Sequence, residues 1–281
     1  MLIKPRSESD LLKIMRILNA RMNLNEDEKK QYLYLKKGYE GEVAFDLLTA
    51  SNLNSEIYIL NDIMLERNNS KFQIDTVMIV QNTIFPCEVK NYEGDYYYQN
   101  DEFNLCKIKK PISNPLHQLK RSETMLREYL QDDGFHFHIE PYLIFINPGF
   151  FLYQAPQNNS IIFPSQLSCF MKKLNSKPSK LNGMHRKLAD KLTDGHTIDS
   201  PYPKLPPYNY HSLQKGLTCG TCNSPFMYCC ERKATCNHCG YEEEVESAVV
   251  RSVGEFKLLF PDLKSPLILF MIGAGWSSLE R

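Results

Sequence analysis

The sequence predicts an α/β protein with a mixed sheet flanked by helices, followed by a small cysteine-rich domain. Residues 73–98 contain two apolar strand segments joined by a polar turn at Gln81-Asn82. A helix-spaced segment at 115–131 leads into an apolar strand at 139–147, and a crossover of this kind usually joins parallel neighbours. Paired cysteines between 219 and 239 indicate the second domain.

Composition bounds the class of protein. The chain has 281 residues, of which 42% are apolar, enough for one large domain or two. Its 33 basic residues balance its 33 acidic ones, so the formal net charge is zero. This excludes a global electropositive field, and any nucleic-acid surface must be local.

The cysteines and the apolar segments indicate the compartment. Six of the nine cysteines fall between 219 and 239, a clustering that favours metal binding in a reducing environment over disulfides. The N-terminus carries no apolar signal segment, and the longest apolar run, 266–276, is too short to span a bilayer. We therefore expect a cytoplasmic protein with no membrane partner.

Periodicity and punctuation predict the remaining elements. Helices are expected at 8–22, at 26–35, from Gly38 onward, at 165–174 and at 181–192. Strands are expected at 57–60, 95–99, 103–108 and 160–163, most of them in an antiparallel meander, with turns at 61–62 and 67–70. In the helix that starts at Gly38, the expected buried stripe is Val43, Ala44, Leu47 and Leu48, with Glu42 on the other side.

Proline divides the chain. Four prolines between 200 and 216 predict a stiff linker. The domains expected from the sequence are an N-terminal helical segment (1–37), a central α/β domain (38–199), the linker (200–216), a ribbon that carries the paired cysteines (217–246) and a helical tail (247–281). For the tail, a helical cap on the ribbon and a helix-turn-helix are the alternatives, with Val249, Val253, Phe256 and Phe260 as its apolar stripe.

Two other segments have alternative interpretations. Residues 172–191 hold seven Lys or Arg against one Asp, which fits either a solvated helix face or a phosphate-facing surface. The tyrosines at 96–98 either pack on a core or stack on bases.

The first candidate site is Asp75 followed by Glu88-Val89-Lys90. Glu88 and Lys90 are two apart on a strand and so point to one face, where unpaired charges near a core carry a desolvation cost. Two carboxylates can hold Mg²⁺ or Mn²⁺ against a phosphate, and a lysine can orient or deprotonate water. A surface ion pair of Glu88 with Lys90 is the simpler alternative.

Four motifs in order resemble the PD-(D/E)xK nuclease core, and more narrowly the nuclease-related domain, NERD. They are Gly-Tyr-Glu-Gly-Glu at 38–42, Ile-Asp-Thr-Val at 74–77, Cys-Glu-Val-Lys-Asn-Tyr-Glu-Gly at 87–94 and Asn-Pro-Leu-His-Gln at 114–118. The resemblance covers residues 38–147. Ile74 stands where the family name has proline, a common departure.

The resemblance implies a restriction-endonuclease-like fold and a set of roles. Asp75 and Glu88 would be metal ligands, Glu42 a third acid from a helix, Lys90 the catalytic lysine, and Gln118 a helix residue that reaches into the site. On the residues alone, the favoured interpretation of Glu42 is an acid at a helix N-terminus, stabilised by the helix dipole.

The second candidate site is a set of four cysteines. Cys219 and Cys222 form one pair, and Cys236 and Cys239 form another, with thirteen residues between the pairs. Four thiolates from two such knuckles complete a tetrahedral Zn²⁺ site, and a closed site of this kind is structural. We expect Cys229, Cys230 and His238 to be bystanders.

The sequence therefore predicts a Mg²⁺- or Mn²⁺-dependent DNA endonuclease or nickase with a structural zinc. A catalytically silent module that binds nucleic acid or recruits a partner is the alternative, and a scaffold without DNA affinity is a third. The choice between DNA and RNA, endo and exo cleavage, the oligomeric state and the pathway stay open.

Overall fold

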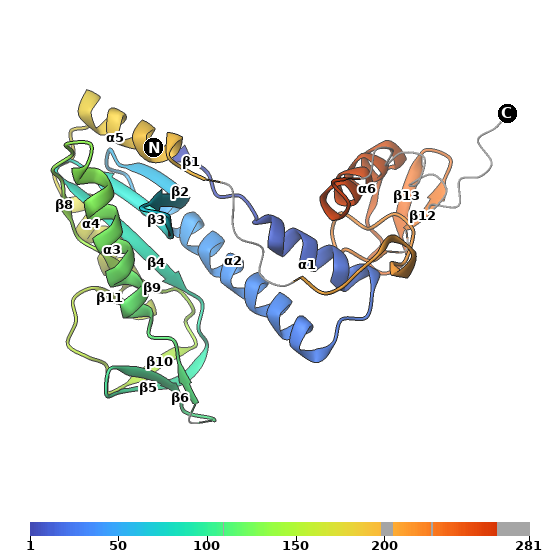
Figure 1. The fold of residues 1–281 in the computed structure, drawn as a ribbon, viewed down its shortest axis with the longest axis horizontal. Helices are drawn as coiled ribbons and strands as arrows, with labels where there is room; N and C mark the ends of the chain where they lie inside the picture. Colours follow the sequence, from blue (N-terminus) through green and yellow to red (C-terminus); the bar gives the residue numbers. More distant parts are fainter. Residues whose placement is uncertain (109, 198–204, 226, 263–281) are drawn as a thin grey trace. The chain divides into compact units, whose positions relative to one another are not determined.

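The chain forms two units in the computed structural model, which describes residues 1–108, 110–197, 205–225 and 227–262 (Figure 1). Unit 1 joins Met1–Ser7 to Lys37–Ser200, and unit 2 joins Glu8–Lys36 to Pro201–Arg281. The segment 1–37 that the sequence sets apart is thus divided between the units.

Unit 1 is built on a seven-stranded mixed sheet in the order β1-β2-β3-β4-β9-β11, with β8 beside β4. Strands β2, β3 and β4 are antiparallel neighbours, whereas β9 pairs parallel with β4 and β11 parallel with β9. The predicted mixed sheet and the parallel crossover through helix α3 are confirmed. The bounds are β1 Leu2–Lys4, β2 Tyr58–Arg67, β3 Ser70–Val80, β4 Thr83–Lys90, β8 His138–Ile139, β9 Tyr142–Phe145, β11 Ile161–Ile162 and α3 Pro115–Gln131.

Helices cover both faces of this sheet. Leu126 of α3 and Leu192 of α5 (Gly183–Asp194) belong to the core on one face. Phe45 of α2 (Glu26–Asn52) and Leu174 of α4 (Leu167–Ser176) belong to the core on the other face. All four side chains are fully buried, and burial of each contributes about 1.5–3 kcal/mol. The short helix η1 (Pro164–Gln166) precedes α4.

A second, four-stranded sheet in the order β10-β5-β6-β7 corrects the predicted continuous meander. From Cys87 onward β4 pairs with β9. The strands that follow β4 in the chain therefore cannot pair with it there and extend the first sheet. Gly94, at φ +98°, begins the new direction, and Phe145 and Phe150 stack in the core between the sheets. The bounds are β5 Gly94–Gln99, β6 Glu102–Leu105, β7 Lys110–Ile112 and β10 Phe150–Tyr153.

Two local predictions were also wrong. Helix α2 runs through Gly38 as one element and buries Gly41, Phe45 and Thr49, while Leu47 is 64% exposed. Gly41 lies so close to Asn91 that a β-carbon there would collide with its side chain, which explains why this face turns inward. Strand β2 continues through the predicted turn at 61–62, because Asp62 adopts a positive φ and the strand pairs on both sides of it.

Unit 2 packs helices beside a small ribbon. Ser9 caps α1 (Asp10–Arg21), which confirms the helix expected at 8–22, and Ile14 and Leu18 of α1 share a core with Leu259. Helix α6 buries Ala248, Ser252, Phe256 and Leu259, a face rotated from the predicted stripe. The bounds are η2 Tyr210–Ser212, β12 Met227–Cys230, β13 Lys233–Cys236, β14 Glu242–Glu244 and α6 Val245–Leu259.

Two predictions fall on the end of the chain. The helix-turn-helix alternative and the apolar run at 266–276 lie outside the described residues. Among the helices that the structure describes, none has the length and apolar character needed to cross a membrane.

Candidate active site and cysteine cluster

Asp75 lies where two strands of the main sheet separate. The β3–β4 ladder ends at the pair Thr76 and Cys87, after which β4 pairs with β9. The Val89 N–H donates to Oδ2 of Asp75 at 2.7 Å, in place of a ladder bond between the two strands. Asp75 is 7% exposed, so this bond holds its carboxylate at the opening of the sheet.

Glu88 and Lys90 project to one face of β4, as the alternation of a strand requires. Lys90 Nζ donates to Oε1 of Glu88 at 2.7 Å and to Oε1 of Gln118 at 3.1 Å. The side chains of Glu88 and Lys90 are 4% and 16% exposed, so the pair is not the solvated surface pair of the simpler alternative. Asn114 caps α3 and thereby places Gln118 in its first turns.

Glu42 approaches from α2 and is held by Arg6, a residue that the sequence analysis missed. Arg6 Nη1 donates to Oε2 of Glu42 at 2.6 Å, and its Nε donates to Oδ2 of Asp46 at 2.8 Å. Its Nη2 donates to the backbone oxygen of Asp75 at 2.8 Å. No motif marks Arg6, because its importance comes from contacts with residues far along the chain.

The carboxyl groups are strongly perturbed. Burial, followed by the charge of Asp75, raises the pKa of both Glu42 and Glu88 to about 8. Burial also raises the pKa of Asp75, although Lys90 and the Val89 N–H oppose it. Burial alone would lower the pKa of Lys90, but the charges of Glu88 and Asp75 raise it above its usual value. Strongly shifted pKa values, set by burial together with specific charged neighbours, are typical of functional sites.

The acids are candidate ligands for a cation. In the described part of the chain, the four cysteines are the one group of three or more His, Cys, Asp or Glu side chains that could hold a metal ion, with ligand atoms within 4.8 Å of one another. The three carboxylates do not form such a group. Asp75 and Glu88 offer the carboxylate oxygens that Mg²⁺ prefers, and Mg²⁺ usually takes one or two carboxylates and keeps several waters. A divalent cation would also relieve the burial of their charges.

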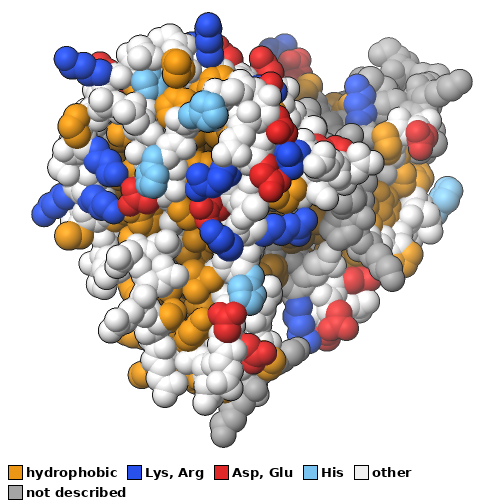
Figure 2. Space-filling model, turned by 60° about the vertical axis from the view of Figure 1, so that its left-hand side comes forward, with side chains coloured by type: hydrophobic (Ala, Val, Ile, Leu, Met, Phe, Trp, Pro, Cys, Tyr) orange, Lys and Arg blue, Asp and Glu red, His pale blue; other side chains and the backbone are white. Residues whose placement is uncertain are grey.

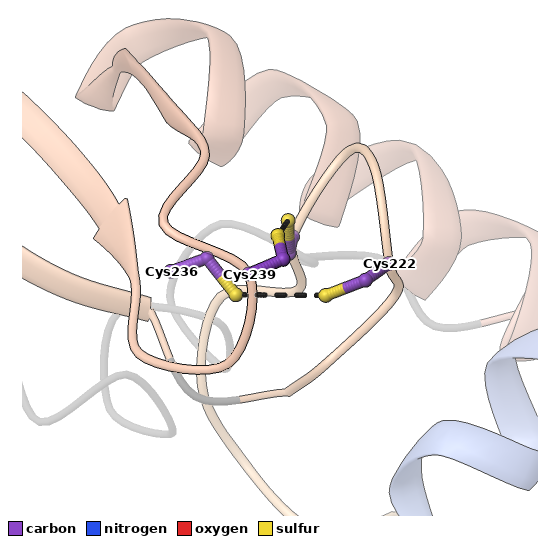
Figure 3. Close-up of side chains that lie close together, drawn as sticks. Cys222, Cys236 and Cys239 are labelled. Carbon is purple, nitrogen blue, oxygen red and sulfur yellow. Dashed lines mark hydrogen bonds between the residues drawn. The ribbon is translucent and has the colours of Figure 1, made fainter.

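The four cysteines converge (Figure 3). The sulfurs of Cys219 and Cys239 are 3.7 Å apart, and those of Cys222 and Cys236 are 3.5 Å apart. A tetrahedral ion with Zn–S bonds of about 2.3 Å separates its ligands by about 3.8 Å, so the cluster fits a zinc ribbon. Cys229 and Cys230 lie on β12, outside the cluster.

Local backbone geometry prepares the sulfurs. The N–H groups of Thr221 and His238 each point at a cysteine sulfur, at 3.4 Å from Cys219 and Cys236 respectively. Gly240 takes φ +72°, which suits the predicted turn of the second knuckle. Burial acts to raise the pKa of the Cys236 thiol. Hydrogen bonds from the backbone N–H groups of Cys239 and His238 act in the opposite direction, and the net result is a pKa lowered to about 6. A thiolate at neutral pH is the form that binds metal.

The basic segment 172–191 mixes with acids on the surface. Figure 2 shows basic and acidic side chains interspersed on the face that it draws. Lys173 and Lys177 both pair with Glu140, and Lys191 pairs with Asp133 at 2.6 Å. These pairs favour the solvated face over a phosphate-facing surface.

Of the three tyrosines at 96–98, Tyr96 is buried. It packs against Phe150 in the core between the two sheets of unit 1. Of the two alternatives, packing on a core and stacking on bases, Tyr96 therefore takes the first.

Comparison with known proteins gives one family match. Residues 37–146 match the nuclease-related domain, NERD. No curated protein matches the sequence.

Two solved structures have low similarity to this chain. Can2 from Sulfobacillus thermosulfidooxidans in complex with cyclic tetra-adenylate is 14% identical, with 60% of this chain and 51% of Can2 covered and a TM-score of 0.32. VC1899 from Vibrio cholerae is 12% identical, with coverages of 54% and 36% and a TM-score of 0.27. This chain thus spans about half of Can2 and about a third of VC1899, and similarity at this level says nothing about chemistry.

Proposed function

Because residues 37–146 form a nuclease-related domain, we propose that this chain is a divalent-metal-dependent nuclease acting on DNA, as an endonuclease or nickase. The observation that supports this most is the chain of contacts from the Val89 N–H to Asp75, and from Gln118 through Lys90 to Glu88. Three perturbed ionisable groups and a helix side chain at the opening of a sheet are typical of an active site, and carboxylates with a lysine are the groups that metal-assisted phosphodiester hydrolysis uses.

The carboxylates would hold the metal. Asp75 and Glu88 would bind Mg²⁺ or Mn²⁺, and Glu42 would act as the third acid. The bound ion would supply Lewis-acid stabilisation of the charge that develops on the phosphoryl group. The N–H of Val89 fixes the Asp75 carboxylate, so its second oxygen has a defined direction.

Lys90 would act as a cation. Its raised pKa keeps the ammonium protonated at neutral pH, which favours charge stabilisation and water orientation over deprotonation of water. Gln118 accepts from Nζ and so fixes one of its three donors, while Glu88 accepts another. One donor is left to face a phosphate oxygen.

The test is cleavage of supercoiled plasmid by purified wild type, Asp75→Asn and Lys90→Met, with Mg²⁺ or Mn²⁺. Removal of a positioned charge should lower the rate by roughly 100-fold or more. The matched controls are Asp27→Asn and Lys30→Met, an exposed pair on α2. Equal activity in all five proteins would identify a contaminating nuclease and reject the proposal.

A silent binding module is the second candidate. The observation in its favour is that Arg6 already holds Glu42 and the three carboxylates do not lie within one ligand sphere. It predicts binding of DNA or RNA that weakens with salt, without cleavage under any divalent ion. Filter binding at graded salt, beside the plasmid assay, separates the two functions.

A further inference from the structure

Arg6 is a cation that the proposed mechanism does not use. Its side chain is only 3% exposed, and its guanidinium donates to two carboxylates, a backbone oxygen and a hydroxyl. The carboxylates belong to Glu42 and Asp46 on α2, and the other acceptors are the Asp75 oxygen and Thr76 Oγ1 on β3. Arg6 thus joins the helix of the third acid to the strand of the first.

An edge strand brings Arg6 to this position. Strand β1 pairs parallel with β2, at Leu2 with Ile59 and at Lys4 with Leu60. Lys4 Nζ then donates to the backbone oxygens of Asn61 and Asp62, at 2.9 and 2.7 Å. Arg6 follows two residues later, so its backbone is anchored beside the acids and does not depend on the ion pairs alone.

The donors of Arg6 are directed inward. Nε and Nη2 donate to the two carboxylate oxygens of Asp46 at 2.8 and 3.1 Å, a two-pronged contact. Nη1 donates to Oε2 of Glu42 at 2.6 Å. A guanidinium engaged in this way cannot also clamp a phosphate. Among the described residues, none donates a hydrogen bond to Oε1 of Glu42, so one oxygen of that carboxylate stays available.

We propose that Arg6 is a positioning residue that holds the Glu42 carboxylate beside Asp75 and thereby strengthens divalent-metal binding. The proposal rests on the proposed function. Its physical basis is that a fixed arginine orients an acid before the ion arrives, so less reorganisation is needed at binding. Outer partners of metal ligands typically contribute 10- to 100-fold to metal affinity or activity.

The experiment measures Mn²⁺ binding by calorimetry on the full chain, together with plasmid cleavage as a function of Mn²⁺. Arg6→Gln should weaken Mn²⁺ binding by roughly 10- to 100-fold and move the cleavage curve by the same factor. Arg6→Lys should recover part of the loss, because it restores the charge without the two-pronged contact. Asp46→Asn, which loosens the anchor of Arg6 and leaves its charge, should give a smaller shift in the same direction.

Arg67 is the matched control. It makes the same pattern of contacts in unit 1, with Nε on Asp132 at 2.8 Å and Nη1 on Glu128 at 2.5 Å, at the other end of α3 from Gln118. Arg67→Gln should leave both Mn²⁺ curves unchanged. Thermal unfolding checks that each variant is folded, and if Arg6→Gln is not, Arg6→Lys and Asp46→Asn decide the outcome.

The two proposals fail in different ways. If the wild type binds Mn²⁺ and cleaves DNA but the Arg6 variants match it, only the role of Arg6 is rejected. Tighter binding in Arg6→Gln would also reject it, because Arg6 would then compete with the ion. If the wild type neither binds Mn²⁺ nor cleaves, the proposed function fails and the role of Arg6 fails with it.

Discussion

The cysteine cluster and the acidic site are two candidate cation sites built by different means. All four sulfurs come from one segment, 219–239, and two tight turns bring them within 4.8 Å of each other. The acids come from α2, β3 and β4, and they are placed by a strand separation and by Arg6. One site is assembled locally, and the other exists only when the whole of unit 1 is folded.

The difference extends to charge. The one cation near the cysteine cluster among the described contacts, Arg251 beside Cys219, is held by Glu243, so the four thiols need an external ion to ionise together. The acidic site contains two, since Arg6 pairs with Glu42 and Lys90 pairs with Glu88. We therefore expect the first site to depend on metal for its fold, and the second to stay folded without metal but to lack activity.

The largest expected effect is on the cysteine cluster. Cys236→Ser, or a strong chelator, should release one zinc per chain and unfold the ribbon, because structural zinc contributes on the order of 10 kcal/mol to small domains. Zinc analysis by mass spectrometry and hydrogen exchange across 217–246 would measure this. Unit 1 should keep its exchange protection, and its loss together with the ribbon would remove the contrast between the sites.

The acidic site should show itself in the pH dependence of stability. Glu88 has a pKa of about 8 in the fold against an ordinary 4.5, so the folded chain holds the extra proton between those values. Its contribution to the free energy of unfolding is complete below pH 4.5 and is lost as pH rises toward 8, by about 1.4 kcal/mol per pH unit at most. Denaturant unfolding of metal-free protein from pH 5 to 8 would measure this.

The control for the pH series is Glu88→Gln. It should decline less steeply with pH, because one of the two raised carboxyls is gone. Saturating Mg²⁺ should flatten the wild-type curve, since the ion replaces the proton. A wild-type curve that rises between pH 5 and 8 would contradict the burial of these acids.

A smaller effect is expected at Gln118. Gln118→Ala removes one of the two side-chain acceptors of Lys90 and should slow cleavage about fivefold, the value of one net hydrogen bond of about 1 kcal/mol. Gln131→Ala, at the other end of the same helix, is the matched control. Equal rates for the two variants would show that Lys90 needs no support from α3.

The smallest effect is expected at Cys230. This exposed residue on β12 is outside the sulfur cluster, so Cys230→Ser should change stability by less than about 0.5 kcal/mol and leave the zinc content unchanged. Set beside Cys236→Ser, it tests whether position within the ribbon, and not cysteine chemistry alone, decides ligation. Loss of zinc in both variants would require a different ligand set.

Local patterns predicted much of the fold. The cap at Ser9, the start of α3 at Asn114-Pro115 and the parallel return to β9 depend on neighbouring residues or on the chirality of the chain. The wrong predictions involve competition between distant segments. Strand β5 left the first sheet because β9 pairs with β4 there, and α2 turned its Gly41 face inward because Asn91 packs on it.

The sequence by itself determined the cysteine knuckles and the order of the motifs that carry Asp75, Glu88, Lys90 and Gln118. It could do so because each of these depends on spacing within a short segment. Only the tertiary structure decided that Arg6 holds Glu42 and that Lys90 is shared by Glu88 and Gln118. Contacts of this kind join residues far apart along the chain, and the pairing of such residues is set by the packing of the whole unit.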